Sequence, residues 1–209
     1  MATQAAELQH YVDYGVKNRG YYSIEAKGPL LDKVYSLRYQ SYRSKGFINA
    51  NKSHLFMDKY DELGNSRSFL TYFGNTLVGS LRCSLYTPDE ALPVPVMEIF
   101  DEEIRTHVGV NKRILEVNRL VVHPDFQKKN SIRVRFSIFK NVVEEVKRVG
   151  ADCVVIGVRP EHVRFYKSIF SDVVTSSAKP YPLTKFKAVL LACFNLEEAG
   201  NLILKLSEK

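Results

Sequence analysis

Four basic side chains surround the start of one helix-like segment. They are Lys128, Lys129, Arg133 and Arg135, and they follow an apolar run and a His-Pro-Asp turn in the stretch 115–136. The apolar run is rich in β-branched residues, and helical periodicity starts after the basic loop and continues to residue 149. The stretch therefore predicts a strand, a loop and a helix. Because free N–H groups at a helix start and nearby cations both attract anions, the pattern indicates a phosphate ligand.

The elements that position these cations alternate along the chain. We expect further strands at 21–26, 69–73, 77–85, 152–158 and 186–195, and helices that start at 28–29 and cover 99–108, 160–170 and 196–209. The polar face of the first helix includes Arg38. Residues 45–64 lack periodicity and predict a long irregular loop, a length that is often functional. A hairpin followed by alternating strands and helices predicts an α+β or mixed-sheet domain.

Composition limits the class of protein and its partners. With 209 residues and 45% apolar content, the chain predicts one domain over 1–209, with 1–20 as a poorly ordered lead-in. Lys and Arg exceed Asp and Glu by 30 − 23 = 7, which favours acidic partners. Cys83, Cys153 and Cys193 lie in apolar runs, so we expect reduced thiols in a cytoplasmic protein, without a metal site. No apolar run reaches the ~18 to 20 residues of a membrane span.

Two segments resemble the acetyltransferase-like (GNAT) superfamily. They are VNRLVVHPDFQKKNSIRVRF, residues 117–136, and RFYKSIF, residues 164–170. More narrowly, the chain resembles the acyl-homoserine lactone synthases and the long-chain N-acyl amino acid synthases. This likeness rests on the order and spacing of Arg38, Asp58, Asp61, Gly79, Arg82, Glu116 and Arg119. The resemblance implies a GNAT-like mixed, mostly antiparallel central sheet flanked by helices, and an acyltransferase.

The basic loop bears on the acyl donor. Users of acetyl-coenzyme A carry a Q/R-x-x-G-x-G/A loop, in which glycines let the backbone approach a pyrophosphate. Here Gln127 is kept, but Asn130 and Ile132 stand where glycine or alanine would. The resemblance therefore favours acyl-phosphopantetheine on an acyl carrier protein, whose acidic face suits Lys128, Lys129, Arg133 and Arg135. No permanently bound cofactor is expected.

The resemblance also implies catalytic roles. Glu116 is the candidate general base, in a cleft expected between the strands around Glu116 and Val155. The backbone near Val121 and Val122 is expected to stabilise the oxyanion, and Tyr166 is the candidate acid for the departing thiolate. The acceptor's carboxylate needs a cation, for which the candidates are Arg38, Arg82 and Arg119.

Each of these residues has a structural alternative. Glu116 and Arg119 could form an ion pair at a strand edge. Asp58 and Asp61 are expected to orient the loop through Arg38 or Arg82 rather than to do chemistry. Tyr166 could pack against the sheet, and the basic loop could be a solvated face. His123 is expected to be a turn residue, because no neighbouring His, Cys or acid has metal-ligand spacing.

Three functions follow from these observations. The first is transfer of a fatty acyl group from an acyl carrier protein to the α-amine of an amino acid, with tyrosine as the acceptor that the family implies. The second is synthesis of an acyl-homoserine lactone, or use of coenzyme A; the absence of Trp and of loop glycines disfavours these. The third is a basic module that binds nucleic acid, for which no recognised motif is present. We expect the first function and no nucleic-acid partner; neither the oligomeric state nor the acyl chain length follows from the sequence.

Overall fold

A computed structural model describes residues 20–127, 131–170 and 173–208, and its centre is one twisted β-sheet. The strands lie side by side in the order β1-β2-β3-β4-β5-β8-β6, and β7 pairs with β8. Their bounds are β1 Tyr21–Ala26, β2 Ser66–Phe73, β3 Thr76–Tyr86, β4 Ile114–Val122, β5 Cys153–Val158, β6 Val173–Thr175, β7 Lys179–Pro180 and β8 Lys187–Cys193. The expected lead-in, residues 1–20, lies outside the described residues except for Gly20.

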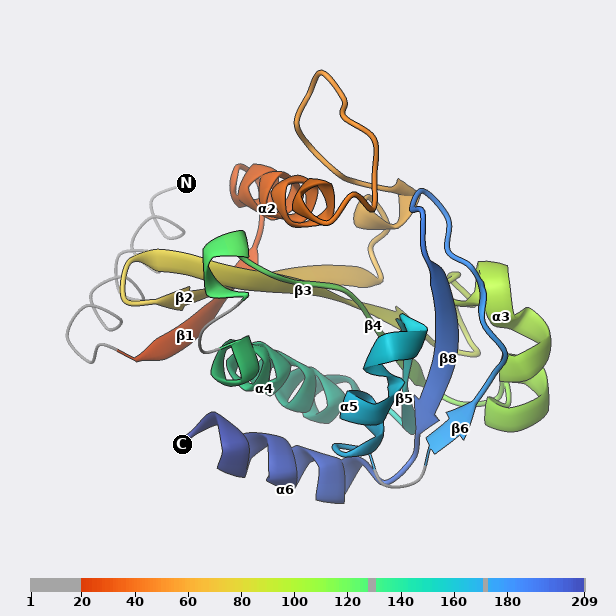
Figure 1. The fold of residues 1–209 in the computed structure, drawn as a ribbon. Helices are drawn as coiled ribbons and strands as arrows, with labels where there is room; N and C mark the ends of the chain where they lie inside the picture. Colours follow the sequence, from red (N-terminus) through yellow and green to blue (C-terminus); the bar gives the residue numbers. More distant parts are fainter. Residues whose placement is uncertain (1–19, 128–130, 171–172, 209) are drawn as a thin grey trace.

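Helices cover both faces of the sheet, as Figure 1 shows. On one face lies α2, and on the other lie α4, α5 and α6. The bounds are α2 Leu30–Ser44, α3 Met97–Glu103 with a π-helical continuation at Ile104–Val108, α4 Ser131–Val149, α5 Val163–Lys167 and α6 Leu196–Ser207. Since β4 and β5 are parallel and the other paired strands are antiparallel, the predicted mixed, mostly antiparallel GNAT-like sheet is confirmed.

The predicted elements agree with the structure except at the two shortest strands. The first strand has the expected bounds, and Gly74 turns the β2–β3 hairpin with φ of +55°, a value that glycine adopts without steric cost. Neither β6 nor β7 was expected. They have three and two residues, too few to show an alternating pattern.

The single parallel pair of strands opens into a cleft. Hydrogen-bonded register between β4 and β5 runs from Ile114 opposite Cys153 to Val117 opposite Ile156. Beyond that point the two strands separate, and both line a cavity. The cleft therefore opens one position after Glu116 and Val155, which agrees with the expectation that it opens around those two residues.

A bulge in β4 turns Arg119 out of the regular alternation. Ser80 pairs with Val121 and Arg82 with Asn118, so β4 has one more residue than β3 across this interval. Arg119 takes a φ of +52°, which is uncommon outside glycine. Because of the extra residue, both of the neighbours Asn118 and Arg119 contact buried polar groups. Asn118 contacts Arg82 of β3, and Arg119 contacts Asp58 in the loop before β2.

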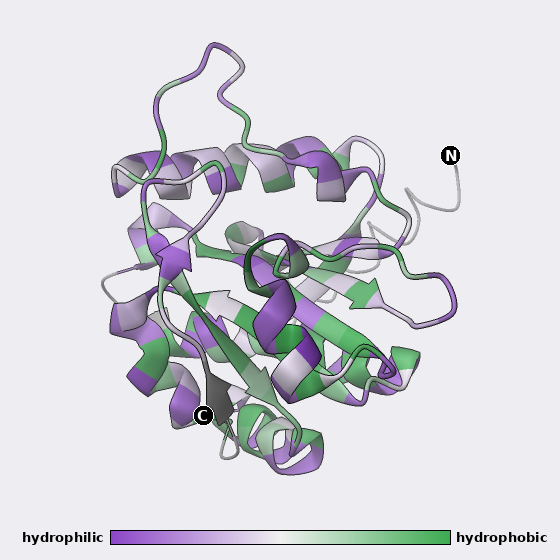
Figure 2. Ribbon diagram, turned by 90° about the vertical axis from the view of Figure 1, so that its right-hand side faces the viewer, coloured by the Kyte–Doolittle hydropathy of each residue, from purple (hydrophilic) through white to green (hydrophobic). Residues whose placement is uncertain are grey.

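The apolar core fills both faces of the sheet. The larger cluster joins β3, β4, β5 and β8 to α4 and α6, and Figure 2 shows green apolar residues on the central strands and alternating colours along the helices. A side chain at Gly79 would meet α4 at Ile138 and would lie 2.8 Å from the Val121 carbonyl oxygen. This glycine lets α4 pack closely on the sheet beside the cleft.

Arg38 is on the buried side of α2, so its predicted place on the polar face was wrong. Val34, Leu37, Arg38 and Ser41 are all buried and follow the spacing of one helical stripe. The apolar residues alone defined the predicted stripe, and a charged residue was therefore excluded from it. Two of its guanidinium nitrogens donate to Asp61 and Ser68, which come from other segments.

Candidate active site

Glu116 is a fully buried carboxylate that accepts a backbone hydrogen bond. It lies on β4, and the N–H of Val96, the residue before α3, donates to its Oε2 at 2.8 Å. Its Oε1 is buried without a hydrogen-bond partner. Burial raises the pKa of Glu116 to about 7, against the opposing effects of the Val96 N–H and of Arg82. A carboxyl group with this pKa can accept a proton near neutral pH and release it again.

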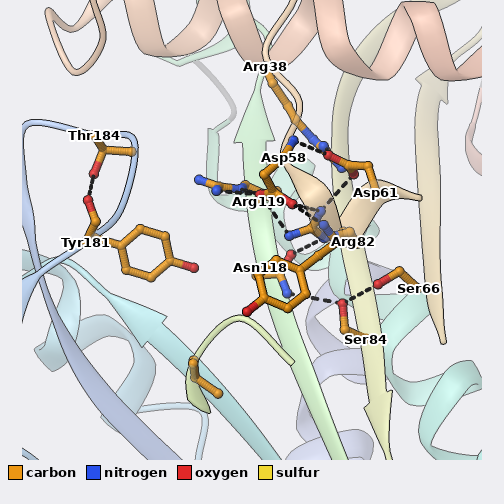
Figure 3. A network of polar contacts seen from close by, with 12 residues as sticks. Arg38, Asp58, Asp61, Ser66, Arg82, Ser84, Asn118, Arg119, Tyr181 and Thr184 are labelled. Carbon is orange, nitrogen blue, oxygen red and sulfur yellow. Dashed lines mark hydrogen bonds and ion pairs between the residues drawn. The ribbon is translucent and has the colours of Figure 1, made fainter. Parts of the chain in front are cut away.

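A buried network of ion pairs (Figure 3) includes Arg82, whose charge acts on Glu116. Asp58 accepts from Arg82 at 2.7 Å and from Arg119 at 2.6 Å. Asp61 pairs with Arg38 at 2.7 Å and with Arg82 at 2.8 Å. These contacts join α2, β3, β4 and the loop before β2. They agree with the expectation that the two aspartates orient the 45–64 loop through arginines.

The two aspartates also cap their own turn. Asp58 accepts from the N–H of Tyr60 at 3.0 Å, and Asp61 accepts from the N–H of Asp58 at 2.9 Å. This capping box starts the 3-10 turn Lys59–Asp61. Although burial opposes ionisation, Arg82 and Arg119 hold the pKa of Asp58 well below its usual range. Asp58 is therefore a fixed negative charge rather than a proton acceptor.

Arg119 pairs with Asp58. The alternative considered above was an ion pair between Arg119 and Glu116 at a strand edge. In the described part of the chain, Glu116 accepts from Val96 and forms no ion pair with Arg119. The guanidinium of Arg119 lies between the rings of Phe56 and Tyr181, at 4.9 and 5.4 Å from their centroids. Its Nη1 is buried without a partner. One donor of this arginine thus remains available to an anionic ligand.

The cleft between β4 and β5 has a volume of about 280 Å³. Its walls are the separated strand ends, α2, the start of α4 and α5, and two loops. The lining includes the predicted residues Arg119, Val121, Val122, Gln127, Arg135 and Tyr166. The structure thus brings one group of predicted residues into a single cavity, although they come from β4, α4 and α5.

A second cavity, of about 320 Å³, adjoins the same arginine. Arg119 and Tyr181 line both cavities, so the two spaces meet at these residues. Apolar and aromatic side chains form most of the second cavity, which is lined by Asp58, Lys59, Tyr60, Pro95, Glu98, Ile99, Arg119, Tyr181, Pro182 and Leu183. Its residues come from the long loop, the start of α3 and the segment before β8, a combination that suits a small amphiphilic molecule.

Glu116 lies next to this junction. Burial raises the pKa of Tyr181, and the charge of Glu116 contributes to that rise. In Figure 3 the hydroxyl of Tyr181 points toward Arg119 and Asn118. A carboxylate with a neutral-range pKa therefore lies within electrostatic reach of the point at which the two cavities join.

Tyr166 is buried and lines the cleft. Its ring packs edge-on against Phe139 and Phe165, with centroids at 5.9 and 5.3 Å. Burial raises the pKa of Tyr166 to about 12, so the hydroxyl keeps its proton at neutral pH. Packing and exposure to the cleft occur together, so the structure is compatible with both interpretations of this residue.

The predicted phosphate-binding residues have different surroundings. Lys128 and Lys129 lie outside the described residues. The Gln127 amide donates to the Val122 carbonyl at 2.9 Å and to Ser41 Oγ at 3.1 Å, so it ties the loop to β4 and α2. Arg133 is exposed and does not line the cleft.

The two arginines at the start of α4 face in different directions. Burial raises the pKa of Tyr21 on β1, and the charge of Arg133 opposes that rise, which places Arg133 toward β1. Arg135 lines the cleft, and its guanidinium lies 5.3 Å from the centre of the Phe165 ring. Residues two positions apart lie on nearly opposite sides of a helix, which accounts for this difference.

Sequence reasoning missed several residues that line the site. Val96 donates its backbone N–H to the Glu116 carboxylate, yet an apolar residue before a helix carries no signal for this contact. Tyr181 and Phe186 stack at 5.7 Å on the segment before β8 and line the cleft. Arg159 and His162, directly after β5, also line it. The Arg-Pro-Glu-His spacing could have drawn attention to that last pair.

A comparison with protein families matches most of this chain. The family model described as N-acyl amino acid synthase FeeM matches residues 33–193. The chain belongs to the FeeM family of N-acyl amino acid synthases, and it is an acyltransferase. The predicted likeness is therefore confirmed at the level of family and enzyme class. No curated protein sequence matches the chain.

Solved structures of FeeM and of lactone synthases share the fold. FeeM from uncultured soil microbes has a TM-score of 0.71 at 17% identity, covering 88% of this chain and 97% of its own. The coenzyme A-dependent acyl-homoserine lactone synthase MesI has a TM-score of 0.63 at 15% identity, covering 90% and 95%. For the lactone synthase LasI the values are 0.63 and 14%, with 82% and 89% covered. At these identities the likeness concerns the fold, which these enzymes share with this family member.

The described residues set two further limits. None of the helices in them combines the length and the apolar character that a membrane span requires. The same residues contain no group of three or more His, Cys, Asp or Glu side chains that could hold a metal ion.

Proposed function

We propose that this protein transfers a long-chain fatty acyl group from an acyl carrier protein to the α-amine of an amino acid, giving an N-acyl amino acid. The observation that carries this proposal is the meeting of two cavities at Arg119, next to a buried carboxylate whose pKa is about 7. The acyl-phosphopantetheine arm occupies the cleft between β4 and β5. The amino acid occupies the second cavity, and its amine reaches the thioester at the junction.

Glu116 removes the proton that the amine must lose. The amine attacks the thioester carbonyl as a neutral nucleophile, and the proton passes to Glu116 directly or through one water. A carboxyl group with a pKa of about 7 is ionised often enough at neutral pH to accept that proton. The buried Oε1, which has no hydrogen-bond partner among the described residues, is the oxygen available to receive it.

Backbone N–H groups and Tyr166 act on the other two charges, which form on the thioester oxygen and on the departing sulfur. The oxyanion is held by backbone N–H groups of β4 near Val121 and Val122, where the strand leaves its partner β5 and lines the cleft. The thiolate leaves with the proton of Tyr166, which is still protonated at neutral pH because burial raises its pKa to about 12. The C–N bond forms as the C–S bond breaks, and the arm departs as the free thiol.

Arg119 positions the acceptor. Its unpartnered Nη1 binds the amino acid carboxylate, while Asp58 holds the rest of the guanidinium. Arg38 and Arg82 are fully buried and pair with the two aspartates, so their role is to hold Asp58 and Asp61. The apolar and aromatic lining of the second cavity supports an acceptor with a large apolar or aromatic side chain, such as tyrosine.

The donor is a carrier-bound thioester in this proposal. Positive charge beside the cleft and the absence of glycine at Asn130 and Ile132 support one phosphate rather than a pyrophosphate. With purified protein, turnover should be faster with an acyl carrier protein than with the same acyl group on coenzyme A. The advantage of the carrier should decrease as salt is added, because charged surfaces guide the encounter. Equal rates at every ionic strength would refute the carrier as donor.

The reaction itself is tested by mass spectrometry of extracts from cells that overproduce the protein, with an empty vector and Glu116→Gln as controls. The expected result is a set of N-acyl amino acids that only the unsubstituted protein produces, which identifies the acyl chain and the acceptor together. Acyl-homoserine lactones in place of these products would show that the protein is an acyl-homoserine lactone synthase. Folded protein without any new acylated product would refute the proposal.

A further inference from the structure

The cleft is lined by basic side chains and by no carboxylate among the described residues. The basic set is Lys45, Arg119, Arg135 and Arg159, with His162 beside them. Lys45 follows α2, Arg135 lies in α4, and Arg159 and His162 follow β5. Because like charges repel unless an anion lies between them, a cavity with this lining is suited to an anionic ligand.

Two of these arginines are held in place by aromatic rings. The Arg159 guanidinium lies 4.5 Å from the centre of the Phe47 ring, and that of Arg135 lies 5.3 Å from the Phe165 ring. Arg159 also donates from Nη1 to Glu161 at 2.5 Å and from Nη2 to His162 Nε2 at 2.8 Å. Stacking engages the flat face of a guanidinium and leaves its edge for an anion. The exposed Glu161 can rotate into solvent when another anion arrives.

His162 is neutral and offers one more donor. Burial lowers its pKa, and the charges of Arg159 and Arg135 lower it further, so both arginines lie near the ring although they come from different walls. Since an arginine can only donate, His162 Nε2 must accept from Arg159, and the proton of the neutral ring is then on Nδ1. Two cations and an N–H donor thus converge at one place.

This cluster lies at the open end of the cleft. The strands β4 and β5 are paired at Glu116, separate after Val117, and end at Val122 and Val158. Arg159 is the first residue after β5, so it lies just beyond the end of that strand, whereas Arg119 lies on β4 and lines both cavities. The donor's phosphopantetheine arm can enter the cleft from this open end. When its thioester is at the junction of the two cavities, its phosphate lies toward the cluster.

We propose that Arg135, Arg159 and the Nδ1–H of His162 bind the phosphate of the donor's phosphopantetheine arm. The proposal rests on the proposed function, because it assigns the end of the arm farthest from the thioester. It differs from the expectation drawn from the basic loop, since Gln127 is engaged by the protein and Arg133 faces β1. The site therefore bridges α4 and the segment after β5, and it takes a phosphate from a carrier-bound arm or from coenzyme A.

The test is a binding titration in the absence of any amino acid acceptor. Three donors with one acyl group are compared: the acyl-phosphopantetheine, the acyl-pantetheine that lacks the phosphate, and the acyl-coenzyme A. Arg159→Gln should reduce the preference for the phosphorylated arm over the phosphate-free arm by about tenfold to a hundredfold, the scale of one charge-assisted contact. The titration with acyl-coenzyme A tests whether the pyrophosphate of that donor uses the same contact.

Arg164→Gln is the matched control, because Arg164 is an exposed arginine on α5 that does not line the cleft. It should keep the wild-type preference, and Arg159→Lys should restore part of it. If Arg159→Gln weakens both arms equally, or neither, the phosphate site is refuted. Because the titration involves no turnover, a protein that binds the arms as expected but forms no product would refute the proposed function alone.

Discussion

Two neighbouring groups of buried carboxylates differ in how they are satisfied. Asp58 and Asp61 together contact three arginines, and each also caps a backbone N–H of the same turn. Glu116 accepts from the N–H of Val96, and within the described residues its Oε1 has no hydrogen-bond partner. The pKa of Asp58 is therefore held well below its usual range, whereas burial raises that of Glu116 to about 7.

The difference separates two acids that hold segments together from the one that we propose to be the general base. A carboxylate that arginines surround stays ionised and holds segments together, so it cannot exchange a proton near neutral pH. A carboxylate that is buried with few donors is poised to do so. The family pattern includes both kinds of acid, and only their surroundings distinguish them. The following predictions test that distinction, from the largest expected effect to the smallest.

Arg82→Met should break the network most strongly. It leaves Asp58 and Asp61 buried with fewer cations, and removal of one partner from a buried charge network costs about 3–5 kcal/mol in the free energy of unfolding. Urea unfolding measures the loss. Arg105→Met is the control, because its ion pair with Asp101 is exposed and its loss should hardly change the midpoint. Similar midpoints for the two variants would show that the network does not stabilise the fold.

Glu116→Gln should separate catalysis from stability. Turnover should fall by roughly 10² or more, the usual scale for loss of a general base. Because the folded-state pKa is raised, the stabilisation present below pH ~4.5 is lost as the pH rises through about 7, and Gln avoids that loss. The variant should thus be no less stable at pH 8. Glu144→Gln, at an exposed site on α4, is the control for both assays, and an unchanged turnover in Glu116→Gln would remove this residue from the mechanism.

Arg119→Lys should affect the acceptor more than the donor. Lysine keeps the charge but loses the fork that binds Asp58 and an acceptor carboxylate at once. The preference for an amino acid over its carboxamide should fall by about tenfold, the scale of a charged hydrogen bond. Competition assays with the two acceptors measure this preference, with Arg164→Lys as control. A preserved preference would mean that Arg119 only holds Asp58.

The outline of the fold could be predicted from the sequence, because periodicity and turn residues are local. The first strand, the hairpin at Gly74 and the strand, loop and helix around residue 122 all follow from such signals. Arg38 could not be assigned to the correct face, because apolar residues alone define a predicted stripe and its acidic partners are more than twenty residues away. The short strand β7 carries no pattern at all.

The candidate site was predictable only in part. The spacing identified Arg119 and Glu116, but it did not predict their surroundings. Arg119 lies at the bulge in β4, and Glu116 accepts from the N–H of Val96, so both environments depend on pairing between distant segments. Tyr181 lies at the junction of the cavities only because β8 returns beside β5. Arg159 meets Arg135 near His162 only because α4 and the segment after β5 flank the same cleft.

The most direct test of the central claim is the pH dependence of kcat, measured with saturating donor and acceptor in wild type and in Glu116→Gln. A base works only when it is ionised, so the wild-type rate should rise about tenfold per pH unit below about 7 and then level off. In Glu116→Gln the residual rate should lack that transition. The same transition near pH 7 in both proteins would contradict the account, because the titrating group would then be another residue or the acceptor amine.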